Sequence, residues 1–108
     1  MTIKELTSNN FDAMLDAHPL LVIDFCASWC QPCKAFEKIM LAAQPDYPEV
    51  IFARADIEKE KALAEEFSVR SVPFVMIIKN RTALYADSGV LALKDLREML
   101  DKAKHVAV

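Results

Sequence analysis

The chain has 108 residues, of which 54% are hydrophobic and 27% are charged. A chain of this size can bury one hydrophobic core without disulfide support, so we expect a single domain spanning residues 1–108. Its 13 lysines and arginines against 16 aspartates and glutamates give a formal net charge of -3 and no basic cluster, which argues against a nucleic-acid partner. No apolar run is long enough to cross a membrane, and the N-terminal segment lacks the apolar stretch of a secretory signal, so we expect a cytoplasmic protein without membrane contact.

The first half of the chain predicts a helix, a strand and a second helix. Ser8 or Asn9 can cap a helix, because apolar residues follow at helical spacing. The run PLLVIDFCA at 19–27 is β-branched and continuously apolar except for one carboxylate, which is typical of a strand covered on both faces of a parallel sheet. From Cys33 onward apolar residues again recur at helical spacing, until QPDYP at 44–48 ends the pattern.

The second half predicts further strands and helices in alternation. We expect a strand at 49–57, a helix at 60–67, two adjacent strands at 74–79 and 82–88, and a closing helix from about Leu93 to Lys104. Strands that alternate with helices form βαβ units, and the closing pair of strands adds antiparallel neighbours. The predicted fold class is therefore α/β, with a central mixed sheet and helices on both faces.

The stretch SWCQPCK at 28–34 places two cysteines three positions apart, where the predicted strand ends and the helix begins. At this spacing Cys30 and Cys33 share a helix face and can form a disulfide with little backbone movement. Pro32 suits the first turn of a helix, because its missing N–H would have no partner there. Cys30 would lie at the helix N-terminus, where free N–H groups stabilise a thiolate, so we expect an exposed Cys30 as attacking sulfur and Cys33 as the resolving thiol.

Two other interpretations of the pair remain. The cysteines could be inert core residues, although this spacing at a strand-to-helix junction is typical of a redox pair. A zinc site would need four ligands, and outside the pair the chain offers only Cys26, His18 and His105, without the usual spacing of a second ligand pair. We therefore predict a redox pair and no metal.

Three segments together carry a family resemblance. VIDFCASWCQPCK, then VRSVPFVMIIKN and then DSG resemble thioredoxins over essentially the whole chain. The resemblance implies a thioredoxin fold in which the first cysteine attacks a protein disulfide and the second releases the reduced product. It also implies a monomer without bound cofactor that acts on disulfide-containing proteins and is regenerated by thioredoxin reductase or a similar electron donor.

Asp24 lies in the middle of the apolar run LLVIDFCA. Burial of an unpaired carboxylate favours its protonated form and raises its pKa. The resemblance implies that Asp24 accepts the proton of Cys33, and the alternative is a structural aspartate bonded to a neighbouring group. Arg54 occupies the place where the family usually has a lysine, and we expect it to tune Asp24 by pairing with it and holding the carboxyl ionised, which weighs against the role of proton acceptor.

Pro73 in SVP matches the family loop whose cis proline lies against the cysteines and leaves the backbone of Val72 free to pair with an extended substrate. Gly89, the one glycine of the sequence, predicts a turn or a close backbone approach. The resemblance implies a partner-binding surface made of Trp29, Gln31, Pro32, Ile57, Ser71, Val72, Gly89 and Val90.

The sequence also departs from the family pattern. Gln31 replaces the usual glycine between the cysteines. Cys26 replaces a common tryptophan and is interpreted as a small buried hydrophobe, with a regulatory thiol as the alternative. The hairpin KNRT lacks a glycine, so Asn80 would have to supply a left-handed residue. We therefore predict a divergent protein disulfide reductase, with a disulfide isomerase or oxidase and a non-catalytic binding module as alternatives.

Overall fold

The computed structural model describes residues 3–108. Its elements are β1 (Lys4–Glu5), α1 (Phe11–Ala17), β2 (Leu20–Cys26), α2 (Gln31–Ala43), the 3-10 turn η1 (Gln44–Asp46), β3 (Ile51–Asp56), α3 (Lys61–Glu66), β4 (Phe74–Lys79), β5 (Thr82–Ser88) and α4 (Leu93–Ala103). The five strands form one sheet in the order β1-β3-β2-β4-β5. The first three run parallel and the last two are antiparallel to their neighbours, so the predicted mixed α/β sheet is confirmed.

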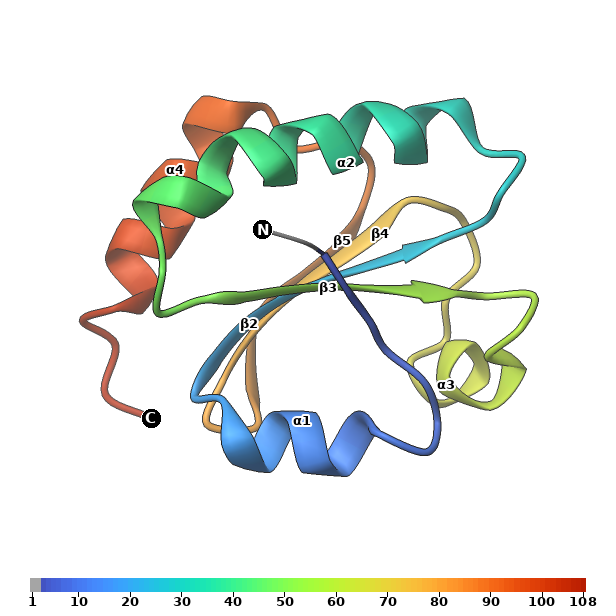
Figure 1. Cartoon of the computed structure of the whole chain (residues 1–108), viewed down its shortest axis with the longest axis horizontal. Coiled ribbons are helices and arrows are strands. Elements are labelled where there is room, and N and C mark those ends of the chain that lie inside the picture. The colour runs from blue at the N-terminus through green and yellow to red at the C-terminus, as the bar shows by residue number, and fades with distance from the viewer. Residues whose placement is uncertain (1–2) are drawn as a thin grey trace.

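Two hydrophobic cores lie on opposite faces of this sheet. Figure 1 shows α2 and α4 above the sheet and α1 and α3 below it. Along β2 the side chains alternate between the cores: Val22 packs with α2 and α4, whereas Ile23 packs with α1 and α3, and both are fully buried. Burial of such a side chain stabilises the fold by roughly 1.5–3 kcal/mol. Asp24 follows Val22 by two positions and therefore points toward the face that α2 covers.

The sequence located most elements but missed one strand. β4 and β5 have the predicted bounds, whereas β1 has only two residues and no periodicity that could reveal it. The predicted cap of α1 at Ser8 or Asn9 is wrong, because Asn10 is the N-cap. Thr7 and Asn10 exchange two hydrogen bonds between backbone N–H groups and side-chain oxygens, and this turn delays the start of the helix.

The β4–β5 hairpin turns through two left-handed residues. Asn80 was predicted to have a positive φ and has φ 48°, and Arg81, which was not predicted, has φ 65°. The guanidinium of Arg81 pairs with Asp12 at 2.8 Å and Asp16 at 2.9 Å on α1. These contacts tie the turn to the helix below the sheet.

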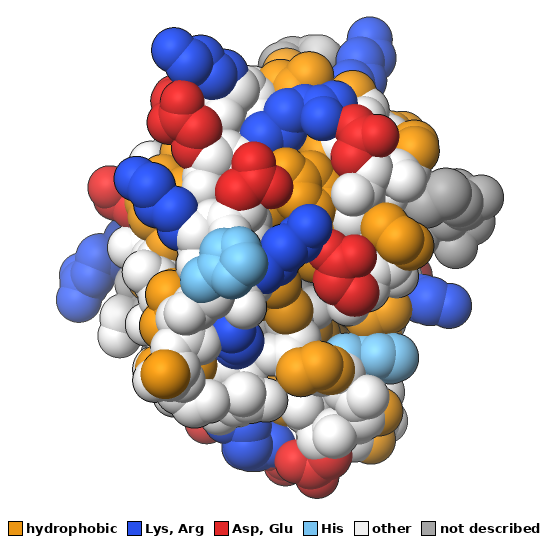
Figure 2. Space-filling model, turned by 90° about the vertical axis from the view of Figure 1, so that its left-hand side faces the viewer, with side chains coloured by type: hydrophobic (Ala, Val, Ile, Leu, Met, Phe, Trp, Pro, Cys, Tyr) orange, Lys and Arg blue, Asp and Glu red, His pale blue; other side chains and the backbone are white. Residues whose placement is uncertain are grey.

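The end of the sheet away from the cysteine pair is shown in Figure 2, where acidic and basic side chains are interspersed among apolar ones. Within the described part of the chain, no helix is long and apolar enough to cross a bilayer.

Candidate active site

The two cysteines lie at the N-terminus of α2 and form a disulfide, with their Cα atoms 5.3 Å apart. Cys30 is the N-cap residue, in extended conformation, and its Sγ accepts a hydrogen bond from the Cys33 N–H at 3.2 Å. Pro32 lies in the first turn, as predicted. The Cys33 N–H at the start of the helix therefore faces the sulfur of Cys30, which is the arrangement that stabilises a thiolate when the disulfide opens.

The pair is less accessible than the sequence predicted. Cys30 was expected to be exposed, but it is 3% exposed and Cys33 is 5% exposed in the disulfide form. The half-buried Ile57 and Val72 pack against the pair, which also contacts Ala27. The expectation of an exposed Cys30 is therefore wrong for the oxidised state.

Asp24 is buried on β2, with 2% of its surface exposed. Within residues 3–108 its Oδ1 has no hydrogen-bond partner. Burial raises the pKa of Asp24 from 3.8 to about 7; the charge of Glu37 adds to this effect, and the charge of Arg54 opposes it. The expected rise in pKa agrees with the structure, and within residues 3–108 Oδ1 lacks the bonded neighbour that the alternative of a structural aspartate requires.

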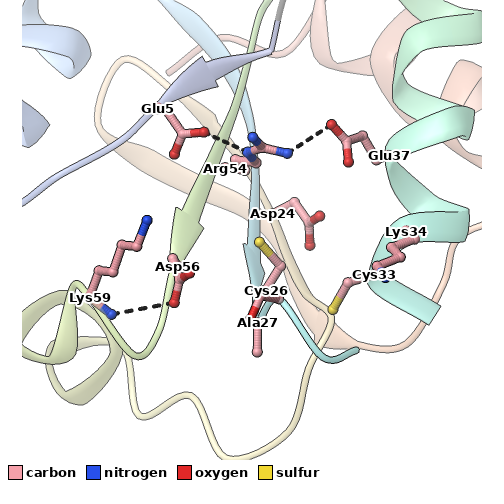
Figure 3. A pocket seen from close by; sticks show the side chains of 11 residues that line it. Glu5, Asp24, Cys26, Ala27, Cys33, Lys34, Glu37, Arg54, Asp56 and Lys59 are labelled. Carbon is pink, nitrogen blue, oxygen red and sulfur yellow. Dashed lines mark hydrogen bonds and ion pairs between the residues drawn. The ribbon is translucent and has the colours of Figure 1, made fainter. Parts of the chain in front are cut away.

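The expected pairing of Arg54 with Asp24 is wrong. The Arg54 Nε donates to Glu5 at 2.7 Å, and its Nη1 donates to Glu37 at 2.8 Å. Figure 3 shows the guanidinium held between these two carboxylates, while the Asp24 carboxyl lies beside it without a bond. Two better-placed acceptors compete for the cation, and sequence reasoning identified neither of them.

A cavity of about 290 Å³ opens beside Asp24. Its lining comes from β1, β2, β3 and α2 with their adjoining loops: Glu5, Asp24, Cys26, Ala27, Ser28, Cys33, Lys34, Glu37, Arg54, Asp56 and Lys59. The cavity brings Asp24 and Cys33 to one space that is large enough for several water molecules. A proton can therefore pass between the two groups without crossing the apolar core.

Sequence reasoning missed Glu37 and Glu5. Glu37 follows Cys33 by four positions on α2, so the helical repeat places both on one face and could have revealed it. Glu5 gave no such signal, because β1 is too short to recognise. Cys26 was interpreted as a buried hydrophobe, but it is only half-buried and lines the cavity, where burial raises the pKa of its thiol to about 12.

The loop before β4 has the expected conformation. The Val72–Pro73 peptide bond is cis. Pro73 is buried, and its carbonyl accepts a hydrogen bond from the Gly89 N–H at 2.8 Å. The described residues provide no hydrogen-bond partner for the backbone of Val72. An extended peptide could therefore pair with Val72 at the edge of the disulfide.

The other residues of the expected partner-binding surface differ in their exposure and contacts. Trp29 is 64% exposed and Val90 is 42% exposed, so both side chains are accessible to a partner. The Ser71 hydroxyl donates to Ser88 at 2.7 Å, which joins the loop before β4 to the end of β5. Gly89 has φ 107° and open space around it, so its turn and not a close approach explains the glycine. Gln31 and Pro32 are exposed in the first turn of α2.

The thioredoxin family model matches residues 2–102 of the chain. The chain belongs to the thioredoxin family. A Streptomyces coelicolor protein described as a thioredoxin 2 is 34% identical over 100 residues, which cover 93% of this chain and 75% of that protein. The thioredoxin of Buchnera aphidicola subsp. Acyrthosiphon pisum is 32% identical over 102 residues, covering 93% of this chain and 94% of the relative.

Solved structures show the same fold. Chloroplastic thioredoxin z aligns with a TM-score of 0.88 at 17% identity, over 98% of this chain and 97% of that one. Together with the cysteine pair, membership of the thioredoxin family makes the chain a thiol-disulfide oxidoreductase. The family acts on disulfide-containing substrates and takes its electrons from a reductase.

Proposed function

We propose that the chain is a protein disulfide reductase whose reaction runs through Cys30 and Cys33. The observation that carries this proposal is the disulfide at the N-terminus of α2, beside a cavity that also contains a buried carboxyl. In the reduced protein the Cys30 thiolate attacks one sulfur of a substrate disulfide, and the first substrate thiolate leaves. Cys33 then attacks the Cys30 sulfur, which releases the second substrate thiol and forms the Cys30–Cys33 disulfide. The substrate gains two electrons and the protein loses two.

In this proposal Asp24 accepts the proton that Cys33 must lose before it attacks. The two residues line the same cavity, and the raised pKa of Asp24 makes it a base that can take up a proton near neutral pH. In the reverse direction protonated Asp24 returns the proton to Cys33 when the disulfide is reduced. Arg54 acts only indirectly, through its charge.

Partner proteins would bind over the rim of the pair. The exposed Trp29 supplies an apolar anchor, since aromatic side chains dominate such interfaces. Val72 would pair with the substrate backbone, next to Pro73, and the residues of this rim are Trp29, Gln31, Pro32, Ile57, Ser71, Val72, Gly89 and Val90. Half-buried Ile57 and Val72 would move aside or contact the substrate as Cys30 becomes accessible.

The physiological setting that fits this activity is a monomer in the cytoplasm, regenerated by thioredoxin reductase without a bound cofactor of its own. A reducing compartment keeps the free Cys26 and the active pair available as thiols. Size-exclusion chromatography of the reduced and oxidised protein tests the monomer, and reduction by a thioredoxin reductase with NADPH tests the donor.

The experiment that tests the function is insulin reduction in the presence of dithiothreitol, with wild type, Cys30→Ser and Cys26→Ser compared. We expect activity in wild type and Cys26→Ser and none in Cys30→Ser, because only Cys30 can form the mixed disulfide. Wild type without activity, or a Cys30→Ser variant as active as wild type, would contradict the proposal.

A redox titration against glutathione then tests the direction of the reaction. A reductase should have a potential near that of thioredoxins, roughly -270 mV. A potential close to roughly -120 mV would instead identify a disulfide oxidant. The titration is needed because the residues between the two cysteines influence the reduction potential, and Gln31 stands there in place of the usual glycine.

A further inference from the structure

One row of polar side chains crosses three neighbouring strands beneath α2. Glu5 of β1 is the register partner of Arg54 of β3, and Arg54 is the register partner of Asp24 of β2. Side chains at paired positions of parallel strands project from the same face of the sheet. Glu37 of α2 reaches this row from above, and Figure 3 shows the guanidinium of Arg54 between the two glutamates.

In this row the two glutamates bind the guanidinium of Arg54, which would otherwise be free to pair with the carboxyl of Asp24. Both ion pairs of Arg54 are short, 2.7 Å to Glu5 and 2.8 Å to Glu37, whereas Asp24 Oδ1 has no bond within the described residues. One cation and two anions leave the group with a net charge of -1 beside Asp24. An arginine alone at this place would favour ionised Asp24, and the two glutamates oppose that effect.

Few other charged groups reach Asp24. The remaining ionisable residues of the cavity are Cys26 of β2, Cys33 and Lys34 of α2, Asp56 of β3, and Lys59 of the following turn. Asp56 Oδ1 accepts from the backbone N–H groups of Glu58 and Lys59, and Lys34 is exposed. On β4 the register partner of Asp24 is the buried, apolar Val75. Glu37 and Arg54 are therefore the charges that act most directly on Asp24, which agrees with the causes of its raised pKa after burial.

The ion pairs contribute little to the stability of the fold. The side chains of Arg54, Glu37 and Glu5 are 38%, 35% and 59% exposed. Pairs at this level of exposure contribute about 0–1 kcal/mol each, because water screens them and the long side chains lose entropy. Their effect on the buried carboxyl next to them is less screened, since Asp24 is 2% exposed.

We propose that Glu5 and Glu37 hold Arg54 away from Asp24, and that Glu37 and Arg54 are positioning residues that set the pH at which Asp24 exchanges its proton with Cys33. This inference rests on the proposed function of Asp24 as proton acceptor and adds the residues that control it. Arg54 supplies a positive charge that Glu37 cancels, so changes at the two positions have opposite effects.

Four variants test whether Glu37 and Arg54 displace the titration midpoint of Asp24 in opposite directions. Glu37→Gln removes one anion and frees one side of the guanidinium to approach Asp24, so we expect the titration midpoint of Asp24 to fall by roughly 1 pH unit. Arg54→Gln removes the only cation of the group, so the midpoint should rise. Glu37→Asp retains the charge and should keep the midpoint near that of wild type. Glu66→Gln removes an exposed acid on α3, outside the cavity, and should leave the midpoint unchanged.

The measurement is an NMR titration of the ¹³C carboxyl of Asp24 in the oxidised full chain, followed by the pH profile of disulfide reduction. Asp24 must be ionised to accept the Cys33 proton, so the acid limb of the profile should move to lower pH in Glu37→Gln and to higher pH in Arg54→Gln. If the two substitutions merely loosened the structure, both would lower the melting temperature, and the Asp24 midpoint would not fall in one variant and rise in the other.

The outcomes separate this inference from the proposed function. The NMR titration does not depend on activity, so an inactive wild type contradicts the proposed function alone. Equal midpoints in wild type, Glu37→Gln and Arg54→Gln overturn the inference, as does a fall in the midpoint of Arg54→Gln. Opposite displacements with an unchanged Glu66→Gln control support it.

Discussion

Replacement of Asp24 by asparagine should stabilise the oxidised protein at neutral and alkaline pH. The carboxyl is 2% exposed, and burial raises its pKa from 3.8 to about 7. Between these two values the folded protein keeps a proton that the unfolded chain has released. Because the folded state then binds more protons, the free energy of unfolding of wild type falls as the pH rises through this window.

The size of the effect follows from the two pKa values. Each pH unit between them costs about 1.4 kcal/mol, so the difference of roughly three units lowers the stability of wild type by about 4 kcal/mol at pH 8. At pH 5, which is only about one unit above the lower pKa, the loss of stability is about 1.5 kcal/mol. Below the pKa that Asp24 has in the unfolded chain, this loss of stability disappears. Asparagine has nearly the same shape and no such proton to lose.

The assay is urea unfolding of oxidised wild type and Asp24→Asn at pH 5 and pH 8. We expect the gain in free energy of unfolding to be larger at pH 8 than at pH 5 by about 2–3 kcal/mol. Comparing the two pH values cancels the fixed cost of burying an amide without partners. The matched control is Glu66→Gln, an exposed acid whose replacement should have the same small effect at both pH values. An equal gain at pH 5 and pH 8 would show that Asp24 is ionised in the folded protein and would refute the reasoning.

Three further predictions concern other parts of the site. Gly89→Ala should lower the free energy of unfolding by about 1–2 kcal/mol in urea unfolding, because φ 107° strains any side chain although no atom blocks a Cβ; an unchanged midpoint would contradict this. Cys26 of the reduced protein should react with iodoacetamide at pH 8 roughly 10³-fold more slowly than a free cysteine, since its pKa of about 12 leaves little thiolate, and mass spectrometry of the labelled peptides measures this. Trp29→Ala should raise KM for a protein disulfide about 10-fold. Because Trp29 is 64% exposed, its loss should barely change stability, and a large fall in melting temperature would place it in the core instead.

Local patterns in the sequence determined the elements around the active site. The apolar run before Cys30 predicts a central strand, and the spacing of Cys30 and Cys33 with Pro32 predicts a pair at a helix start, because both depend on residues that are neighbours in the chain. A carboxylate in that run predicted buried Asp24 by the same reasoning. The cis conformation at Pro73 followed only from the family resemblance, since only about 5–6% of X-Pro bonds in folded proteins are cis.

The tertiary structure alone decided what surrounds the Asp24 carboxyl. Arg54 is 49 residues from Glu5 and 17 from Glu37, and sheet order and helix packing, not sequence spacing, bring them together. The burial of Cys30 likewise depends on Ile57 and Val72, which reach it from distant loops. Sequence periodicity indicates which face of a helix or strand a residue occupies. A long, flexible arginine side chain can pair with any acceptor near it, and only the packing of the folded chain determines which acceptors those are.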